Sequence, residues 1–227
     1  MSRPSGSPWS ARETVAGFAR AEPNPVLVAW AGRELARCGE AARLLDLGCG
    51  AARNALPLAR LGWRVVGIDD SAAMLAAAAT RRRSELPDAP LSLLAATMDR
   101  LPFADRCFDL LVAHGIWNLA RTDAELSRAL AEAARVARPG AGLFVFTFSR
   151  STLAPEAEPL PGEAHVFTQF SGVPQVFLTA AELDAELAAH GFAPDPGMPL
   201  RELNRDRPRP LGGGPPVIWE AAYRFAS

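Results

Sequence analysis

Short apolar runs of strand length alternate with longer segments of helical periodicity through the first two thirds of the chain. Because each run is apolar throughout, and not only at alternate positions, we expect strands that are buried on both faces of a parallel sheet. Strand–helix alternation of this kind predicts an α/β fold with helices on both faces of the sheet. The predicted strands are residues 43–47, 64–68, 91–95, 108–113 and 142–148, and the predicted helices between them are residues 53–61, 71–83 and 123–137.

The segments on either side of this core extend the same architecture. The helix over residues 123–137 is expected to stop at Arg138-Pro139-Gly140. A later helix is marked by a capping box of Thr179 and Glu182 and by Gly191 after its end. The remaining predictions are helices at residues 10–20, 25–38 and 179–190, an irregular Pro-rich loop at 153–163, and final strands at 198–204 and 216–225 that flank a Pro/Gly-rich stretch at 207–215.

Composition and charge exclude several classes of protein. Of the 227 residues, 49% are hydrophobic, which is typical of a globular domain. The longest apolar stretch is much shorter than the ~20 residues that cross a bilayer, and the first ten residues have no apolar core of the secretory type. A formal charge of −1 and a pI near 6.3 give no general attraction to nucleic acid or to acidic membranes. Three widely spaced cysteines form neither a disulfide framework nor a zinc pattern, so we expect a cytoplasmic protein.

A glycine-containing turn follows the first predicted strand and opens the next helix. It reads Asp46-Leu47-Gly48-Cys49-Gly50, and a second acidic residue, Asp69, ends the next strand. Since ligands of open α/β sheets bind at the carboxyl ends of the strands, we expect this turn to border the site. Gly48 and Gly50 allow the backbone to approach a ligand where a Cβ would collide. A carboxylate at Asp69 can accept hydrogen bonds from both ribose hydroxyls, so the pattern predicts a nucleoside ligand.

A dinucleotide is the competing ligand. Its fingerprint is G-x-G-x-x-G, in which the glycines expose helix N–H groups to a pyrophosphate. Here Arg53 stands at the third glycine position, where close helix–strand packing leaves no room for bulk. Asp46 would also repel a pyrophosphate, whereas it suits the ammonium of an amino-acid moiety. Both features disfavour a dinucleotide oxidoreductase.

Together these residues resemble the class I S-adenosylmethionine-dependent methyltransferases. The segments that carry the resemblance are the glycine-rich motif at 46–50, the ribose-binding strand end at 65–69, the adenine-side loop at 98–103, the fourth strand at 108–112 and the lead into the fifth at 137–142. The segment from Gly50 to Ala55, followed by Gly62-Trp63, resembles the small-molecule and tellurite-resistance branch.

The family resemblance implies a fold as well as a function. We expect a Rossmann-like methyltransferase fold with a seven-stranded, mostly parallel sheet and helices on both faces. The chain would form a single methyltransferase domain of residues 1–227. Its expected parts are an N-terminal helical cap (1–40), a cofactor-binding core (41–150) and a C-terminal part with a lid loop, a helix and the final strand pair (151–227).

The resemblance also implies S-adenosyl-L-methionine as cofactor and assigns its contacts. Asp46 would face the methionine ammonium, Asp69 would hold the ribose hydroxyls, and Asp99 would accept a hydrogen bond from the adenine amino group. The backbone carbonyl of His114 would help to bind the ammonium. The full set of expected cofactor-binding residues is Asp46, Gly48, Cys49, Gly50, Asp69, Asp70, Met74, Met98, Asp99 and His114.

The acceptor side has fewer signals. His114 leaves the fourth strand at its carboxyl end and is the candidate catalytic base. Trp117, Asn118, Arg150 and His165 are candidate substrate contacts, although Trp117 equally suits packing and His165 an exposed loop.

A sulfonium methyl is already activated, so the implied reaction requires no metal, only a positioned acceptor. We expect in-line transfer to an oxygen, nitrogen, sulfur or metalloid atom of a small molecule, by a monomer or homodimer. The alternative is a catalytically silent cofactor-binding sensor or scaffold.

Overall fold

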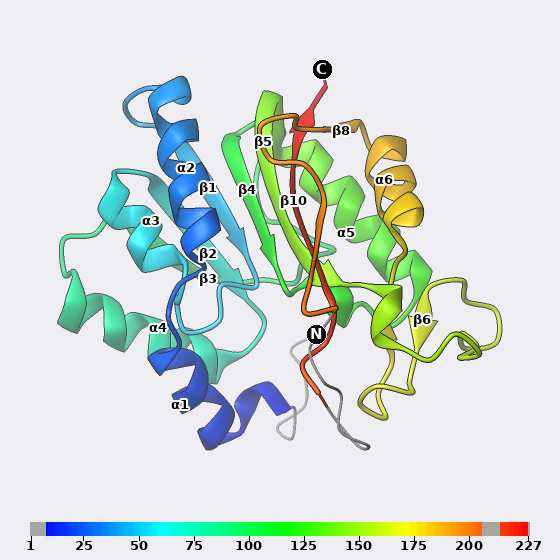
Figure 1. Ribbon diagram of the computed structural model, residues 1–227. Helices are drawn as coiled ribbons and strands as arrows, with labels where there is room; N and C mark the ends of the chain where they lie inside the picture. Colours follow the sequence, from blue (N-terminus) through cyan, green and yellow to red (C-terminus); the bar gives the residue numbers. More distant parts are fainter. Residues whose placement is uncertain (1–7, 206–213, 227) are drawn as a thin grey trace.

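The main sheet of the computed structural model has eight strands, seven of them in one hydrogen-bonded path (Figure 1). The structure describes residues 8–205 and 214–226. The strands of this sheet are β1 (Arg43–Leu47), β2 (Arg64–Asp69), β3 (Leu91–Ala95), β4 (Phe108–His114), β5 (Ala137–Phe148), β8 (Phe192–Pro194), β9 (Arg201–Leu203) and β10 (Ile218–Phe225). The order along the path is β3-β2-β1-β4-β5-β10-β8, and β9 pairs with β10 off the path. Strands β1 to β5 pair in parallel, whereas β10 is antiparallel to β5.

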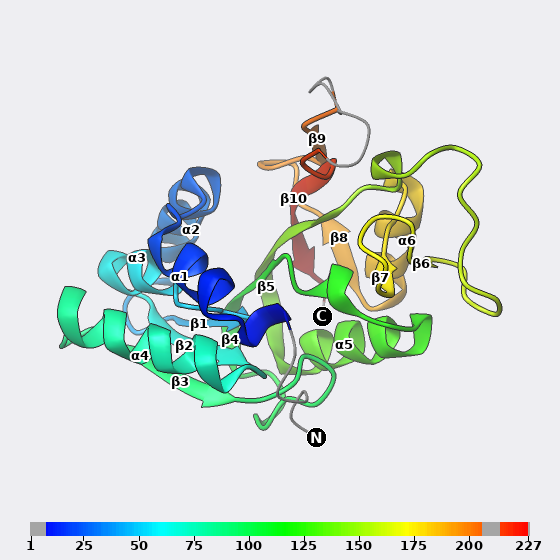
Figure 2. The same cartoon turned by 90° about the horizontal axis from the view of Figure 1, so that it is seen from below.

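Helices cover both faces of this sheet, as the alternation of elements predicts. One face carries α2 (Pro25–Cys38), α3 (Ala55–Leu61) and α4 (Ala72–Glu85), and the other carries α5 (Asp123–Val136) and α6 (Ala180–Ala189) (Figure 1). The short helix η1 (Pro8–Ser10) and α1 (Arg12–Arg20) lie at the edge where the parallel strands end (Figure 2). The minor elements are η2 (Trp117–Leu119), η3 (Arg150–Thr152) and a separate pair of strands, β6 (Val166–Phe167) and β7 (Gln175–Val176).

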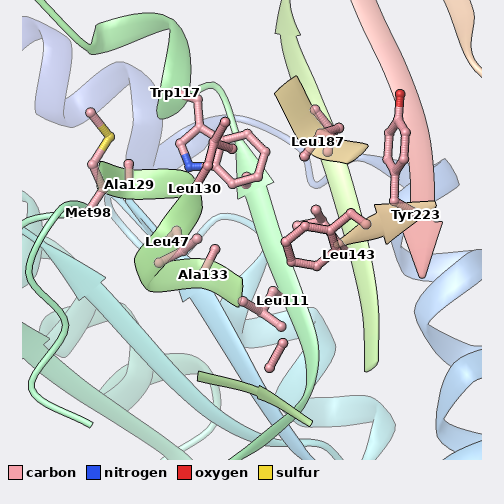
Figure 3. Close-up of a cluster of buried hydrophobic side chains, with 14 of the residues drawn as sticks. Leu47, Met98, Leu111, Trp117, Ala129, Leu130, Ala133, Leu143, Leu187 and Tyr223 are labelled. Atoms are coloured by element: carbon pink, nitrogen blue, oxygen red, sulfur yellow. The ribbon is translucent and has the colours of Figure 1, made fainter. Parts of the chain in front are cut away.

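Each face of the sheet has its own hydrophobic core, because the central strands bury side chains in both directions. On the α5 and α6 face, strand residues pack against helical Ala and Leu side chains, among them Leu47, Leu111, Leu143, Ala129, Leu130, Ala133 and Leu187 (Figure 3). On the opposite face, the core includes Leu44, Leu110, Phe144, Leu27, Trp30, Leu58 and Trp63. The predicted Rossmann-like α/β fold is confirmed.

The predicted boundary between the helix at 123–137 and the strand at 142–148 is wrong. Helix α5 ends at Val136 and the chain enters β5 at once, so Arg138-Pro139-Gly140 is not a loop between them. Phe108 pairs with Ala137 and Leu110 with Gly142, so these residues form a bulge within β5, in which Gly140 has a φ of +76°. Gly140 therefore adopts the left-handed conformation that a glycine allows, but it does so within a β-bulge and not at the end of a helix.

The short elements were not predicted. Strand β8 continues the sheet beyond β10, and β6 and β7 pair as two-residue strands. The final predicted strands are present in shorter form as β9 and β10, and most of the Pro/Gly-rich stretch at 207–215 lies outside the described residues. Within the described part of the chain, no helix has both the length and the apolar character needed to cross a membrane. The division of the chain into cap, core and lid stays a prediction.

Candidate functional site

The turn after β1 has two glycines in the left-handed conformation. The φ angles of Gly48 and Gly50 are +67° and +54°, values that a residue with a Cβ adopts only at a cost. A Cβ on Gly48 would lie 2.6 Å from Cδ1 of Ile116, which covers the turn from the β4 side. The Cys49 amide donates to the carbonyl of Ile68 at 2.8 Å, which ties the turn to β2. The backbone conformation therefore favours glycine at both positions, and at Gly48 a Cβ would also clash with Ile116.

Asp69, the last residue of β2, holds this turn in place. Its Oδ2 accepts a hydrogen bond from the Gly50 amide at 2.9 Å, and its Oδ1 accepts one from the Ser71 amide at 2.8 Å. Ser71 in turn caps α4 by accepting from the Met74 amide. The carboxylate thus connects the glycine turn with the start of the next helix.

Two cavities lie along the carboxyl ends of these strands. The larger, of about 730 Å³, runs beside Gly48, Asp69 and the loop after β3. It is also lined by Arg121, just before α5, and by Glu125 and Arg128 of α5. The smaller, of about 60 Å³, lies between the turn and the N-terminal helices, where Trp9 and Phe18 line it. Eight of the ten predicted cofactor residues line one cavity or both: Gly48, Gly50, Asp69, Asp70, Met74, Met98, Asp99 and His114.

The other two predicted residues, Asp46 and Cys49, lie behind the turn. Asp46 is 2% exposed, and its Oδ2 has no hydrogen-bond partner among the described residues. Burial raises the pKa of this carboxyl to about 7, against the opposing attraction of Arg53. Cys49 is buried as a small apolar side chain, and a Cβ on Gly67 would lie 2.9 Å from its Sγ, so Gly67 gives it room. Burial raises the pKa of the Cys49 thiol, which leaves it unreactive.

This geometry fits an adenosyl amino acid better than a dinucleotide. A buried carboxylate beneath the turn disfavours a pyrophosphate, and its unpartnered oxygen can accept from an ammonium group. A comparison with known sequence families also favours an adenosyl amino acid as the ligand. Residues 45–146 match a family model described as a methyltransferase domain.

The match covers a little under half of the chain.

Curated relatives and solved structures agree with this match. The demethylmenaquinone methyltransferase of Mycobacterium tuberculosis is 38% identical over 123 residues, which are 54% of this chain and 47% of the relative. The chain thus matches about half the length of this relative. An S-adenosylmethionine-dependent methyltransferase of Methanosarcina mazei has the same fold, with a TM-score of 0.72 at 22% identity over 91% of this chain and 99% of the other. A 1,6-didemethyltoxoflavin-N1-methyltransferase of Burkholderia thailandensis, with bound S-adenosylhomocysteine, gives a TM-score of 0.64 at 18% identity over 88% and 78%.

His114 is the last residue of the central strand β4, but it lies in an environment that opposes protonation. Its Nδ1 lies 3.1 Å from Nη2 of Arg53, and its ring stacks on Phe146 with 4.0 Å between ring centroids. Burial, together with the nearby Arg53 charge, lowers the His114 pKa to about 3. A ring with this pKa is neutral at pH 7 and weakly basic, which argues against the predicted general-base role.

Of the four predicted acceptor contacts, Trp117 and Asn118 are buried, and Arg150 and His165 are engaged by other residues. Trp117 is buried in the core beside Ala129 and Leu130 (Figure 3), and Asn118 is 2% exposed, with Oδ1 unpartnered among the described residues. Arg150 donates to the carbonyls of the 154–157 loop, and its guanidinium lies 4.8 Å from the Phe167 ring centroid. His165 pairs with Asp123 at 3.1 Å. None of these four residues lines the two cavities described above, so their assignment to the acceptor stays a prediction.

Sequence reasoning missed the residues that reach the site from distant elements. No local sequence signal marks Ile116 over the turn, or Trp9 and Phe18 on the N-terminal helices. The same holds for Arg128, whose Nε is 3.5 Å from Oδ2 of Asp99. Asn24 does have a local sequence signal, because Asn before Pro25 is typical of a helix N-cap, but this signal predicts only the start of a helix. In the structure it also donates to the buried Glu220 at 2.9 Å and lies 3.3 Å from Nε2 of His114.

Proposed function

We propose that this chain is an S-adenosylmethionine-dependent methyltransferase that acts on a small-molecule acceptor by direct in-line transfer, with no metal needed for activation. One arrangement carries the proposal. Two carboxylates at the ends of β1 and β2, Asp46 and Asp69, flank a turn of left-handed glycines beside a cavity of about 730 Å³. The methyltransferase domain at 45–146 contains all of these residues.

The proposed contacts divide the cofactor among three parts of the site. Asp69 and Asp70 would hold the ribose, and Met98 and Asp99 the adenine side of the larger cavity. Gly48, Gly50 and the backbone at His114 border the smaller cavity and would hold the methionine part, whereas Met74, which also lines it, would pack against the adenine ring. Asp46 would face the ammonium from behind the turn, next to Cys49.

In this reaction the main task of the protein is to position the acceptor. When bound, the cofactor would supply a methyl group on a sulfonium, whose neutral thioether is a good leaving group without prior activation. The described residues would orient the acceptor and exclude water, a contribution of up to ~7–11 kcal/mol to lowering the barrier. Because the His114 ring is weakly basic, the proposal favours an acceptor atom that attacks without giving a proton to this ring.

The names of similar proteins favour a small-molecule acceptor. The curated relatives are named for demethylmenaquinone, and a solved neighbour for 1,6-didemethyltoxoflavin, both small molecules. The segment from Gly50 to Ala55 resembles the tellurite-resistance branch, which keeps a metalloid among the candidate acceptors.

The cysteines Cys38, Cys49 and Cys107 are free thiols, in keeping with the expected cytoplasmic location.

Methyl-labelled S-adenosylmethionine, incubated with fractions of a cell extract, tests the activity. We expect at least one fraction to gain label together with stoichiometric S-adenosylhomocysteine. Asp69→Ala should lower this transfer at least ~10-fold, since a hydrogen-bonded charge contributes about 1.5–3 kcal/mol, whereas Asp88→Ala, on an exposed residue, should not. Binding of S-adenosylhomocysteine without transfer to any fraction would instead favour the silent sensor or scaffold.

A further inference from the structure

The smaller cavity is lined by two chemically different kinds of group. Backbone at the glycines after β1 and β4 forms one part of its lining, where the methionine part of the cofactor is proposed to lie. The side chains that no proposed cofactor contact uses are all apolar, and they come from η1, from α1 and from the segment after β4. These side chains are Trp9, Phe18, Ile116 and Leu119.

Two of these side chains are aromatic and are held over the glycine turn. The Phe18 ring lies close to Gly50, since a Cβ on Gly50 would be 3.8 Å from its Cδ1. Trp9 packs edge-on against Phe18, with 5.7 Å between the ring centroids and an interplanar angle of 77°. The Ser71 hydroxyl donates to the Trp9 carbonyl at 3.1 Å, which ties η1 to the start of α4. Both rings therefore reach the site from the N-terminal helices at the carboxyl edge of the sheet (Figure 2).

Four residues line both cavities and mark the junction between them. They are Gly48, Asp69, Asp70 and Ile116. With the adenosine part of the cofactor in the larger cavity and its methionine part in the smaller one, the sulfur that connects the two parts lies at this junction. The acceptor must reach the same junction, and the lining that the cofactor leaves for it is the set of apolar side chains.

The charges at the junction disfavour an anionic acceptor. Among the described residues, the charged side chains that line the smaller cavity are Asp69 and Asp70, and no arginine lines it. Arg53 approaches the Phe18 ring, with its Cζ 5.9 Å from the centroid, but it does not line the cavity. An anion would lose its hydration there beside two carboxylates, which offset the positive charge of a sulfonium.

We propose that the acceptor presents a neutral, carbon-rich end to the methyl group, and that Trp9 and Phe18 contact it and determine this specificity. An aromatic ring fits best, because aromatic pairs favour edge-to-face and offset-stacked contacts. This inference rests on the proposed function, since it names the class of acceptor for the same site. It excludes oxyanions of metalloids, which the resemblance to the tellurite-resistance branch leaves open.

The size of the cavity adds one requirement. A space of about 60 Å³ admits only the reacting end of such an acceptor beside the methionine part. Room for a whole ring requires a small outward shift of α1. No residue of α1 is buried, so this helix can shift without exposing a core of its own.

Two probes with the same ring system test the proposal, namely 2-naphthol, which is neutral at pH 7, and 2-naphthoate, which is an anion. In fluorescence titrations with saturating S-adenosylhomocysteine, we expect the wild-type protein to bind 2-naphthol at least ~10-fold more tightly, because the anion would be buried without a partner. Trp9→Ser and Phe18→Ser should each weaken 2-naphthol binding by roughly 2- to 10-fold, the range of an aromatic pair. Leu61→Ser, at an apolar residue of α3 that is 40% exposed, is the matched control and should behave as wild type.

Three results would overturn the proposed acceptor class. They are tighter or equal binding of 2-naphthoate, which would favour an anionic acceptor such as tellurite, no binding of either probe, and Ser variants with wild-type affinity for 2-naphthol. The affinity of each variant for S-adenosylhomocysteine shows whether its fold is intact. If a Ser variant loses it, Trp9→Phe, expected to keep most of the 2-naphthol affinity, and the wild-type comparison still decide the question. Wild-type protein that binds no S-adenosylhomocysteine would instead contradict the proposed function itself.

Discussion

The Asp69 carboxylate closes the glycine turn by accepting the Gly50 amide at 2.9 Å. Because its other oxygen accepts from Ser71, one side chain fixes both the turn after β1 and the start of α4. The group proposed to hold the ribose is therefore also the group that shapes the neighbouring turn. Loss of this carboxylate should affect the ribose and methionine parts of the site together.

Asp69→Ala is expected to weaken S-adenosylhomocysteine binding by ~10-fold or more, because charged hydrogen bonds of this kind contribute about 1.5–3 kcal/mol. Asp69→Asn should fall between Ala and wild type, since its amide nitrogen would meet one of the two N–H groups as a second donor. Calorimetric titration measures both affinities, with Asp88→Ala as the exposed control. Wild-type affinity in the Ala variant would show that the ribose site is misassigned.

Gly48→Ala places a methyl group against Ile116 in a backbone with φ of +67°. The left-handed conformation alone costs about 1–2 kcal/mol for a residue with a Cβ. Ile116 lines both cavities, so its displacement should also narrow the site and lower nucleoside affinity. Thermal unfolding and titration measure the two effects. The second change Ile116→Ala should restore part of the affinity, whereas Gly32→Ala, where a Cβ meets nothing within 4 Å on α2, should leave affinity unchanged. An unaffected Gly48→Ala protein would contradict the proposed steric role.

Asp46→Asn is expected to stabilise the fold while it weakens cofactor binding. Burial raises the pKa of Asp46 in the folded chain to about 7 from 3.8, so its ionisation is unfavourable there. At one pKa unit per 1.36 kcal/mol, the gain at pH 8 is on the order of 1–4 kcal/mol. The penalty in the wild type grows as pH rises from about 4 to 7 and is constant above that. The difference in melting temperature between variant and wild type should therefore be small near pH 4 and largest at pH 8. A difference independent of pH would exclude ionisation of Asp46 as its cause.

Cofactor affinity should depend on pH through the same carboxylate. An ammonium group favours ionised Asp46, whereas the free protein holds a proton there below a pKa of about 7. S-adenosylhomocysteine affinity is therefore expected to fall as pH decreases below about 7, by up to tenfold per unit, and to level off above it. The His114 pKa of about 3 adds no step between pH 5 and 8. Titrations across this range should give a flat profile for Asp46→Asn, and an equally steep profile in that variant would assign the dependence to another group.

The parts of the fold and site that the sequence predicts are those with local signals. The bounds of β1 and β3 match the predicted residues, because apolar runs of that length mark strands. Burial on both faces, however, was wrongly predicted for β3, which lies at the end of the sheet path and leaves Ser92, Leu94 and Ala95 exposed. Asp46, Gly48 and Asp69 could be placed because the carboxyl ends of parallel strands meet at one edge. Strands β6 and β7 have two residues each, too few for any periodicity to mark them.

The environment of the site residues depends on contacts across the chain. Arg53 appeared only as a bulky residue that excludes a dinucleotide, because its contact with His114 spans 61 positions in sequence. The low pKa of His114 follows from burial and from that contact, so a base role was plausible from its position alone. The same reason explains why Ile116 over Gly48 was not predicted.

A paired titration of the wild-type protein with S-adenosylhomocysteine and with NADH tests the central claim most directly. We expect saturable, one-to-one binding of S-adenosylhomocysteine and no binding of NADH at the same concentrations. Binding of NADH, or the absence of S-adenosylhomocysteine binding, would contradict the assignment of this site.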